Sequence, residues 1–267
     1  MKKRLSFTVS GSERIRIGMS KSLAVLGSPI SHSKSPQIQL AALQTLGIEA
    51  TFDRIDVSDL AAFFKLHQSF DAISLTMPLK EQARSVADWE HPLVERTNSA
   101  NYLLRKDESW QAFNTDVFGI QKAAEGLEAK TVGILGTGAT ARSALVAMSD
   151  KDTYIWGRKS PLAEELAKNY GARLSQLDEA LSCDLVISTL PGDALSALAS
   201  SGYPGVLLDV VYSRPSPAGF SGYRSGLSML IWQAIGQLRL LINGADHPLP
   251  NEEQLASVML SAAELAE

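Results

Sequence analysis

The chain has 267 residues, which is long for one compact domain and comfortable for two. Its composition, with 45% hydrophobic and 20% charged residues, is that of an ordinary globular protein, and no apolar run approaches the length of a membrane span. The net charge of −4, with lysines and arginines scattered along the chain, argues against a nucleic-acid-binding surface.

The beginning of the chain differs in composition from the rest. Residues 1–18 contain five basic side chains and one acid but lack the apolar centre of a secretory signal. We expect a poorly structured extension there, with Met19 as a candidate native start. The single cysteine, Cys183, excludes an intrachain disulfide and favours a reducing, cytoplasmic location. It precedes the apolar run "DLVIST", so we expect a small buried side chain.

In the first half, short apolar runs alternate with helical patterns from residue 22 onward. The patterns predict strands at 23–27, 50–57 and 72–77, helices at 35–47, 58–67 and 79–88, and a hairpin formed by 99–106 and 109–114. Ser35 and Ser58 are expected to cap the first two helices, with Pro36 in the first turn of the first helix and Gly47 ending it.

The second half begins near residue 130 and has continuous apolar runs of the kind found in parallel sheets. These runs lie at 131–136, 153–158, 184–189 and 206–211, and helical patterns separate them at 139–149, 160–169 and 193–200. The alternation predicts an α/β doubly wound sheet. The tail from about 227 to 266 is helical apart from a break at 243–251.

A glycine loop follows the first strand of the second half. Gly136, Thr137, Gly138 and Ala139 begin the pattern G-x-G-x-x-A, directly after a strand and at the start of a helix. Such a loop lets the backbone approach a pyrophosphate, and the helix N-terminus offers unpaired N–H groups. A glycine-rich turn without a ligand is the alternative, but this placement favours a dinucleotide site.

The residues at the end of the next strand indicate which dinucleotide would bind. An NAD site usually has an acidic residue there, whereas this chain has Gly157, Arg158 and Lys159. Two cations suit the 2′-phosphate of NADP. The alternative is a pair of solvated loop cations, but the missing acid still counts against NAD.

Polar side chains cluster at the strand ends of the first half, where ligands bind in open α/β sheets. They are Ser31, His32, Ser33 and Ser35, then Ser74, Thr76 and Lys80, then Asn101, Asn114, Thr115 and Asp116. Taken alone, Lys80 could be a solvated lysine at a helix start and Asp116 a helix N-cap. Together at an interdomain cleft, they would form a proton-transfer pair for carbonyl and alcohol chemistry.

The ordered motifs "GSPISHSKSP", "SLTMPLKE", "SANYLL", "FNTDVFG", "LGTGATA", "GRK", "DVVYSRP" and "GLSMLIWQA" resemble the shikimate dehydrogenase family from about residue 22 onward. The resemblance implies NADPH-dependent, reversible reduction of 3-dehydroshikimate to shikimate in chorismate and aromatic amino acid biosynthesis. It implies a substrate-binding domain at 19–120, joined by C-terminal helices at 229–267, and a Rossmann-like NADP domain at 121–228. The implied partners are a small-molecule substrate and at most a second copy of the chain, with no metal, nucleic acid or membrane.

The resemblance also implies roles for single residues. Lys80 and Asp116 match the catalytic pair. The residues that match substrate-binding positions are Ser33, Ser35, Ser74, Thr76, Lys80, Asn101, Thr115, Asp116, Tyr212 and Gln233. The residues that match cofactor-binding positions are Gly136, Thr137, Gly138, Ala139, Gly157, Arg158, Lys159, Thr189, Val210 and Gly226.

The chain departs from the family pattern at two notable positions. Ser74 stands where a substrate-binding asparagine is usual, and Tyr102 replaces a threonine next to Asn101. Side chains alternate along a strand, so Tyr102 is expected to point away from the Asn101 face. These departures keep open the alternative of a related binding protein with little turnover. An NAD-linked quinate/shikimate dehydrogenase is a second alternative, against which the Arg158–Lys159 pair and the serines that match the carboxylate site count.

Overall fold

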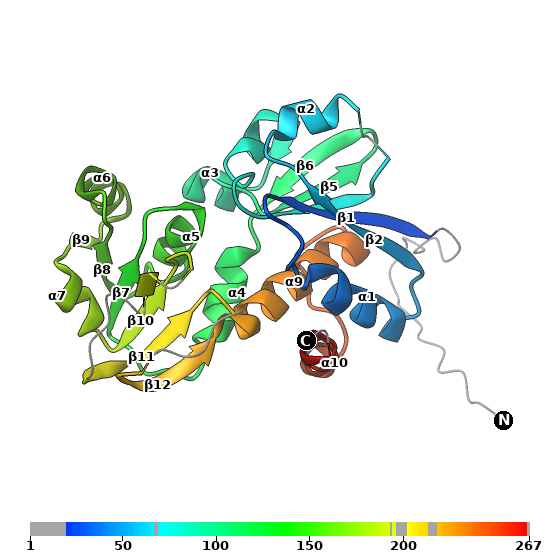
Figure 1. The fold of residues 1–267 in the computed structure, drawn as a ribbon. Coiled ribbons are helices and arrows are strands. Elements are labelled where there is room, and N and C mark those ends of the chain that lie inside the picture. Colours follow the sequence, from blue (N-terminus) through cyan, green and yellow to red (C-terminus); the bar gives the residue numbers. More distant parts are fainter. Residues whose placement is uncertain (1–19, 67–68, 193, 196–201, 213–217, 266–267) are drawn as a thin grey trace.

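The computed structural model describes residues 20–66, 69–192, 194–195, 202–212 and 218–265. The described strands form two six-stranded sheets, each with helices packed on it (Figure 1). The predicted extension 1–18, Met19 and most of the predicted helix 193–200 lie outside the described residues.

The first sheet is mixed and has the strand order β2-β1-β3-β5-β6-β4. Its strands are β1 (Lys21–Gly27), β2 (Ala50–Asp56), β3 (Ala72–Leu75), β4 (Trp89–Glu90), β5 (Tyr102–Lys106) and β6 (Ser109–Phe113). β1 pairs in parallel with β2 and β3, while β5 and β6 form the predicted antiparallel hairpin. The carboxyl ends of β1 and β3 therefore meet at one edge of the sheet, next to the start of β5.

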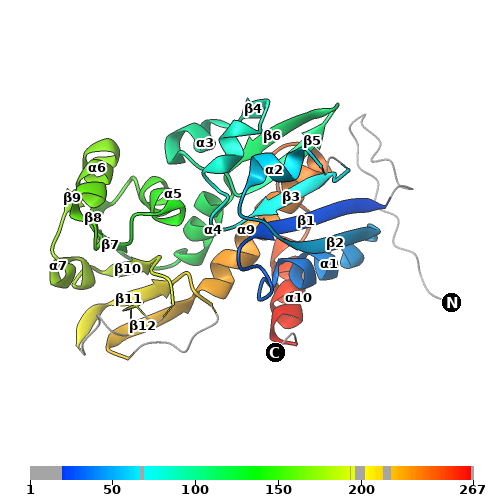
Figure 2. The same ribbon diagram turned by 45° about the horizontal axis from the view of Figure 1, so that its top comes forward.

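The two faces of the first sheet bury different side chains because strand residues alternate. On one face Leu23 joins a core formed with α1 (Ser35–Thr45), α9 (Gly226–Asn243) and α10 (Glu252–Glu264). On the other face Ala24 joins a core that includes α2 (Leu60–Phe64) and the 3₁₀ turn η1 (Gln82–Ser85). The view in Figure 2 shows α2 on one side of β1 and β3, with α1 and α10 on the other.

The second sheet is entirely parallel, with the strand order β12-β11-β10-β7-β8-β9. Its strands are β7 (Thr131–Leu135), β8 (Asp152–Trp156), β9 (Arg173–Leu174), β10 (Leu185–Ser188), β11 (Tyr203–Asp209) and β12 (Phe220–Ser225). The helices α5 (Ala139–Ala147), α6 (Ser160–Tyr170) and α7 (Leu177–Leu181) connect them. The order reverses between β7 and β10, which confirms the predicted α/β doubly wound architecture.

Two helices connect the sheets. α4 (Asp116–Ala123) leaves the first sheet, α9 returns to it, and the two pack side by side (Figure 1). They lie close together at Gly119, where an added Cβ would lie 2.7 Å from the carbonyl oxygen of Met229 and 2.8 Å from Cβ of Gln233. A larger residue at position 119 would push α9, and Gln233 with it, away from α4.

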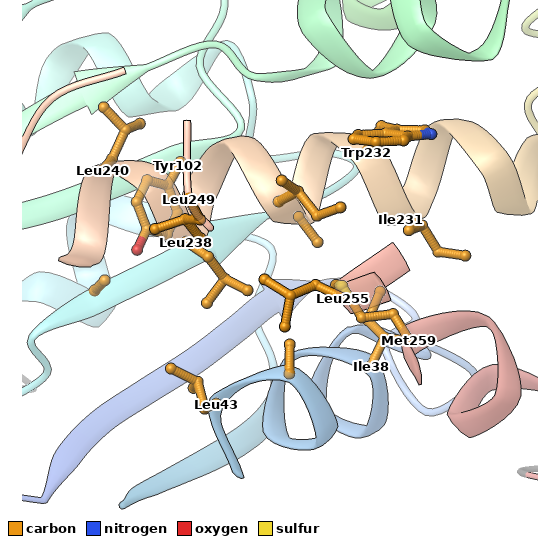
Figure 3. Packing of buried hydrophobic residues seen from close by; sticks show 14 of the residues in the cluster. Ile38, Leu43, Tyr102, Ile231, Trp232, Leu238, Leu240, Leu249, Leu255 and Met259 are labelled. Carbon is orange, nitrogen blue, oxygen red and sulfur yellow. The ribbon is translucent and has the colours of Figure 1, made fainter. Parts of the chain in front are cut away.

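The C-terminal helices complete the core of the first sheet, as predicted from the resemblance. In Figure 3, Leu238 and Trp232 of α9 and Met259 of α10 lie with Ile38 and Leu43 of α1 in one apolar cluster. Truncating one such buried aliphatic side chain to alanine typically lowers the free energy of unfolding by about 2–5 kcal/mol.

Several local predictions were wrong. The segment 79–88 is not an α-helix. Leu79 closes a turn by donating its N–H to the carbonyl oxygen of Thr76 at 2.8 Å, η1 follows, and the carbonyl of Lys80 accepts the backbone N–H of Ala100 at 2.8 Å. That bond ties this segment to the loop before β5 instead of to a further helical turn. Short elements that the patterns did not predict are β4, α3 (Pro92–Thr97), β9, α7 and β12.

The predicted helix caps were also misplaced. Lys34 occupies the N-cap of α1 without a side-chain bond, so Ser35 is the first residue of the helix. Asp59 rather than Ser58 caps α2, and its carboxylate accepts the N–H of Ala62 at 3.0 Å. Thr115 occupies the N-cap of α4, which leaves the Asp116 side chain for other contacts.

None of the described helices is long and apolar enough to cross a membrane. Within the same residues, no cluster of histidine, cysteine and acidic side chains could hold a metal ion.

Candidate active site

A cavity of about 300 Å³ lies where the first sheet faces the glycine-loop side of the second. Its polar wall comes from the strand ends of the first sheet and from α9, while Thr140 of α5 and Val210, directly after β11, line it from the other side. The predicted substrate-binding residues that line it are Ser33, Ser35, Ser74, Thr76, Lys80, Asn101, Asp116, Tyr212 and Gln233.

Lys80 and Asp116 form an ion pair at this cavity. The Lys80 Nζ lies 2.5 Å from Asp116 Oδ2, and the side chains are only 15% and 4% exposed. Lys80 is carried by the turn after β3, and Asp116 is the first residue of α4. An ammonium group held this way can donate a proton to an oxygen in the cavity, and the carboxylate keeps the ammonium oriented.

Asn101 holds Asp116 from the other side. Its Nδ2 donates to Asp116 Oδ1, to Thr115 Oγ1 and to Gln233 Oε1, each at 2.9 Å. Its Oδ1 accepts the backbone N–H of Thr115 at 2.7 Å, which fixes the orientation of the amide. Both carboxylate oxygens of Asp116 therefore have donors within the protein, one from Asn101 and one from Lys80.

The other predicted substrate-side residues differ in how they meet the cavity. Thr115 is buried and does not line it; its hydroxyl bonds Asn101 instead. Tyr212 reaches the cavity from the segment after β11. Burial raises the pKa of its phenol, while a hydrogen bond with the backbone of Lys34 acts in the opposite direction. This contact joins the second-sheet side of the cavity to the segment before α1.

Tyr102 does not enter the cavity, as the strand alternation predicts. Its ring is 2% exposed and packs in the core near Leu238 of α9 (Figure 3). It lies directly opposite Ser74 across the β3–β5 pair. Burial raises the pKa of its phenol, so Tyr102 stays neutral and acts as a core side chain.

The glycine loop lies at the carboxyl ends of three adjacent strands. Gly136 follows β7, Gly157 follows β8 and Thr189 follows β10. A Cβ on Gly136 would lie 2.2 Å from Thr189 Oγ1, and one on Gly157 would lie 2.5 Å from Cγ2 of Thr137. Gly136 also has a φ of +119°, which side-chain-bearing residues rarely adopt. A side chain at either position would collide with a neighbouring threonine, so the close packing of the loop over the strand ends requires glycine at both.

A second cavity of about 310 Å³ connects this loop to the ion pair. Gly138, Ala139 and Thr189 line one side, and Thr76 and Lys80 line the other. Since Thr76 and Lys80 also line the first cavity, the ammonium group stands where the two cavities meet. Of the other predicted cofactor residues, Val210 and Gly226 line the first cavity.

Arg158 and Lys159 lie just beyond β8 and are exposed. Neither forms an ion pair with any residue that the structure describes. Two unneutralised cations beside a dinucleotide loop can bind a phosphate, and the loop geometry and these charges together fit NADP.

The residue patterns missed two buried amides of the site, Gln39 and Gln237, but included Asn114. Gln39 and Gln237 are each 1% exposed and hydrogen-bond Ser74 or Gln233. Asn114 donates from Nδ2 to Thr97 and to Ser143 of α5, and its Oδ1 accepts the N–H of Asp116. The only available signal for Gln237 was its spacing of four residues from Gln233 in an apolar helix.

Polar contacts also join α5 to the first sheet's side. Arg142 donates from Nε to the carbonyl oxygen of Thr97 at 2.7 Å, and its Nη2 bonds the Glu81 carboxylate. Glu81 is the neighbour of Lys80, so these bonds tie the helix that follows the glycine loop to the segment that carries the ammonium group.

Comparisons with known proteins agree with this arrangement. The family model of the shikimate dehydrogenase substrate binding domain matches residues 25–103. The NADP(+) shikimate dehydrogenase of Thermus thermophilus is 30% identical over 251 residues, or 86% of this chain and 95% of that protein. That of Hyphomonas neptunium is 31% identical over 245 residues, or 81% and 89%.

Solved structures give the same result. The shikimate dehydrogenase of Mycobacterium tuberculosis has a TM-score of 0.78 and 32% identity, covering 92% of this chain and all of that one. The Thermus thermophilus enzyme, solved with NADP(H) and shikimate, has a TM-score of 0.77 and 27% identity, covering 91% and 99%. Because these relatives match nearly end to end and share its two-sheet architecture, the chain belongs to the shikimate dehydrogenase family.

Proposed function

We propose that this protein is an NADP-dependent shikimate dehydrogenase, which reversibly reduces 3-dehydroshikimate to shikimate and thereby serves chorismate and aromatic amino acid biosynthesis. The Lys80–Asp116 pair at the junction of two cavities carries this proposal. One cavity has the hydroxyl and amide groups that suit a small polyhydroxylated carboxylate, and the other has the dinucleotide loop.

In the proposed reaction, bound NADPH supplies the hydride to the ring carbonyl carbon. Lys80 donates a proton to the carbonyl oxygen, so that the C=O group becomes a CH–OH group. Asp116 keeps the ammonium group oriented and balances its charge. Because Lys80 is still 15% exposed, it can regain its proton from solvent. In the reverse direction Lys80 accepts the hydroxyl proton.

The other residues bind and orient. We assign the substrate carboxylate to Ser33 and Ser35, because both residues line the cavity in the segment after β1 and lie side by side, with the Ser35 N–H 3.4 Å from Ser33 Oγ. We assign the ring hydroxyls to Ser74, Thr76, Asn101 and Asp116, helped by Thr115, with Tyr212 and Gln233 closing the cavity. Arg158 and Lys159 are assigned to the 2′-phosphate and the glycine loop to the pyrophosphate.

We further propose the division into a substrate-binding domain, 19–120 with 229–267, and an NADP domain, 121–228. The first two segments share one core through α9 and α10, which supports this division. A cytoplasmic location and a monomeric or homodimeric state are also proposals, the former because Cys183 is the single cysteine.

The test is the rate of NADPH formation from shikimate and NADP, with quinate and NAD as controls. We expect turnover with shikimate and NADP and a much lower kcat/KM when either is replaced. A preference for quinate with NAD would favour the NAD-linked alternative. NADPH binding by calorimetry without turnover of either substrate would show a binding protein instead.

A further inference from the structure

Gln237 lies at the centre of a buried amide network that the proposed reaction leaves unexplained. It is 1% exposed, lines the substrate cavity and lies one helical turn after Gln233 on α9. Its Oε1 accepts one hydrogen bond from the Ser74 hydroxyl, at 2.8 Å, and another from Gln39 Nε2, at 2.7 Å. Its Nε2 donates to Gln233 Oε1 at 2.8 Å and to the carbonyl oxygen of Asn101 at 3.4 Å.

Backbone groups, which cannot exchange donor for acceptor, fix the direction of this network. The backbone N–H of Thr115 donates to Asn101 Oδ1 and so fixes the orientation of that amide. The carbonyl oxygen of Leu230 accepts a hydrogen bond from Gln233 Nε2 at 2.8 Å and fixes the Gln233 amide in the same way. The carbonyl of Asn101 accepts Gln237 Nε2 in the same way. If the Gln237 amide turned over, its oxygen would face two other acceptors, Gln233 Oε1 and the carbonyl oxygen of Asn101, so one orientation is strongly favoured.

This direction decides what Ser74 offers to a substrate. Ser74 is 5% exposed, and the proton of its hydroxyl is committed to Gln237. Its contact with Gln39 Nε2, at 3.5 Å, is long. Ser74 therefore presents a lone pair to the cavity, which suits a substrate hydroxyl that donates a hydrogen bond.

We propose that Gln237 is a positioning residue that determines substrate recognition in this protein. It supplies from α9 the buried amide that the resemblance expects at position 74, and it fixes both the donor direction of Ser74 and the orientation of Gln233. The inference rests on the proposed function, because it concerns the same cavity and substrate.

The first test is Gln237→Leu, which keeps the volume and removes the amide. We expect KM for shikimate to rise about tenfold, because the Ser74 hydroxyl and the Gln233 oxygen each lose a partner. The KM for NADP should not change, and kcat should change far less than KM for shikimate. The matched control is Gln254→Leu, at an exposed position of α10. An unchanged KM for shikimate, or equal rises in both KM values, would overturn the positioning role.

The second test exchanges the two positions. An asparagine at 74 reaches further than serine and collides with Gln237, whose oxygen is 2.8 Å from Ser74 Oγ. Ser74→Asn alone should therefore raise KM for shikimate at least about tenfold, and Ser74→Asn with Gln237→Ala should restore it to within about threefold. If KM for shikimate is as high in the double variant as in Ser74→Asn alone, the proposal is wrong. This second test also decides the question if the Gln237→Leu protein does not fold.

The wild-type protein separates this inference from the proposed function. If wild-type protein fails to turn over shikimate, the proposed reaction is wrong, and the increase in Tm caused by shikimate then replaces KM in both tests. If wild-type protein turns over shikimate but the variants behave otherwise than expected, only the role of Gln237 fails.

Discussion

The Lys80 ammonium and the Asp116 carboxylate lie 2.5 Å apart, although 36 residues separate them in the chain. The turn after β3 presents the lysine, and the first turn of α4 presents the aspartate. Neither position is informative alone, since each suits an ordinary solvated or capping residue. Their meeting at a buried junction of two cavities is what makes them the candidate catalytic pair.

Replacing Lys80 with methionine removes the proposed proton donor and keeps the length of the side chain. We expect kcat to fall by about 10²–10⁴-fold, the usual contribution of a positioned acid or base. NADPH affinity, measured by fluorescence titration, should stay within about threefold because the glycine loop is intact. Lys106→Met, at an exposed position of the β5–β6 hairpin, is the control and should keep the wild-type rate.

Asp116→Asn tests whether the pair acts as a unit. The substitution keeps the size of the side chain but removes the charge that orients Lys80, so we expect kcat to fall about a hundredfold. When Lys80→Met and Asp116→Asn are combined, the loss should barely exceed that of Lys80→Met alone. Additive losses would mean that Asp116 acts independently of Lys80.

Arg158→Leu tests the choice of cofactor. Because the substitution removes the proposed charged hydrogen bond to the 2′-phosphate, we expect kcat/KM for NADP to fall about 10–100-fold while the value for NAD stays the same. Initial rates with both cofactors give the ratio. Lys168→Leu, an exposed change on α6, should leave the ratio as it is.

The contact between α9 and α10 should make stability depend on pH. Arg239 binds Glu252 with two bonds of 2.7 Å. Burial alone would raise the pKa of Glu252, but the bonds from Arg239 and from the N–H of Leu249 outweigh it and lower the pKa. A lowered pKa in the folded state means stabilisation that is present above the unfolded value of about 4.3 and lost as the pH falls through the folded value.

Glu252→Gln should therefore lower Tm at neutral pH. In acid, the Tm of the variant should equal that of the wild-type protein. We expect a destabilisation of about 1–3 kcal/mol at pH 7, because the charged hydrogen bonds are weakened. Thermal unfolding of wild type and variant at pH 7 and at pH values below 4 measures both. Glu253→Gln is the control, since its carboxylate is exposed and lies 3.9 Å from Lys122. A constant difference across the pH range would contradict the assignment.

The single cysteine should react slowly with alkylating reagents. Burial raises the pKa of the Cys183 thiol to about 11, against a smaller opposing effect of a hydrogen bond with Thr131. At pH 8 only about 0.1% of the thiol is then ionised. Moving the thiol one residue to an exposed position, with Ser182→Cys and Cys183→Ser, should accelerate alkylation by iodoacetamide at least about a hundredfold. Equal rates would mean that Cys183 is accessible.

The long periodic segments could be predicted from the sequence, and tertiary contacts explain much of what could not. The βαβ alternation and the glycine loop reflect local patterning, so β7, α5 and β8 lie where predicted. The helix expected at 79–88 failed because the carbonyl of Lys80 bonds Ala100, a partner that no local pattern reveals. β12 was missed because "FSGYRS" lacks a continuous apolar run.

The site shows the same division. Strand-end polar residues such as Lys80 and Asp116 could be predicted because parallel strands end at one edge of a sheet. Gln237 could not, since a glutamine in an apolar helix gives no sign of which face it lies on until the helix is packed. The serine at position 74 is explained only by the packed structure, in which its hydroxyl donates a hydrogen bond to Gln237 Oε1.

The return of α9 and α10 to the first sheet has a consequence for synthesis on the ribosome. The second sheet is built from one continuous stretch of chain and can close as soon as that stretch emerges. The first sheet emerges earlier but cannot cover Leu23 and Ile38 until the helices at the other end of the chain arrive. The part translated first is therefore completed last, and its apolar face stays uncovered on the nascent chain during this interval.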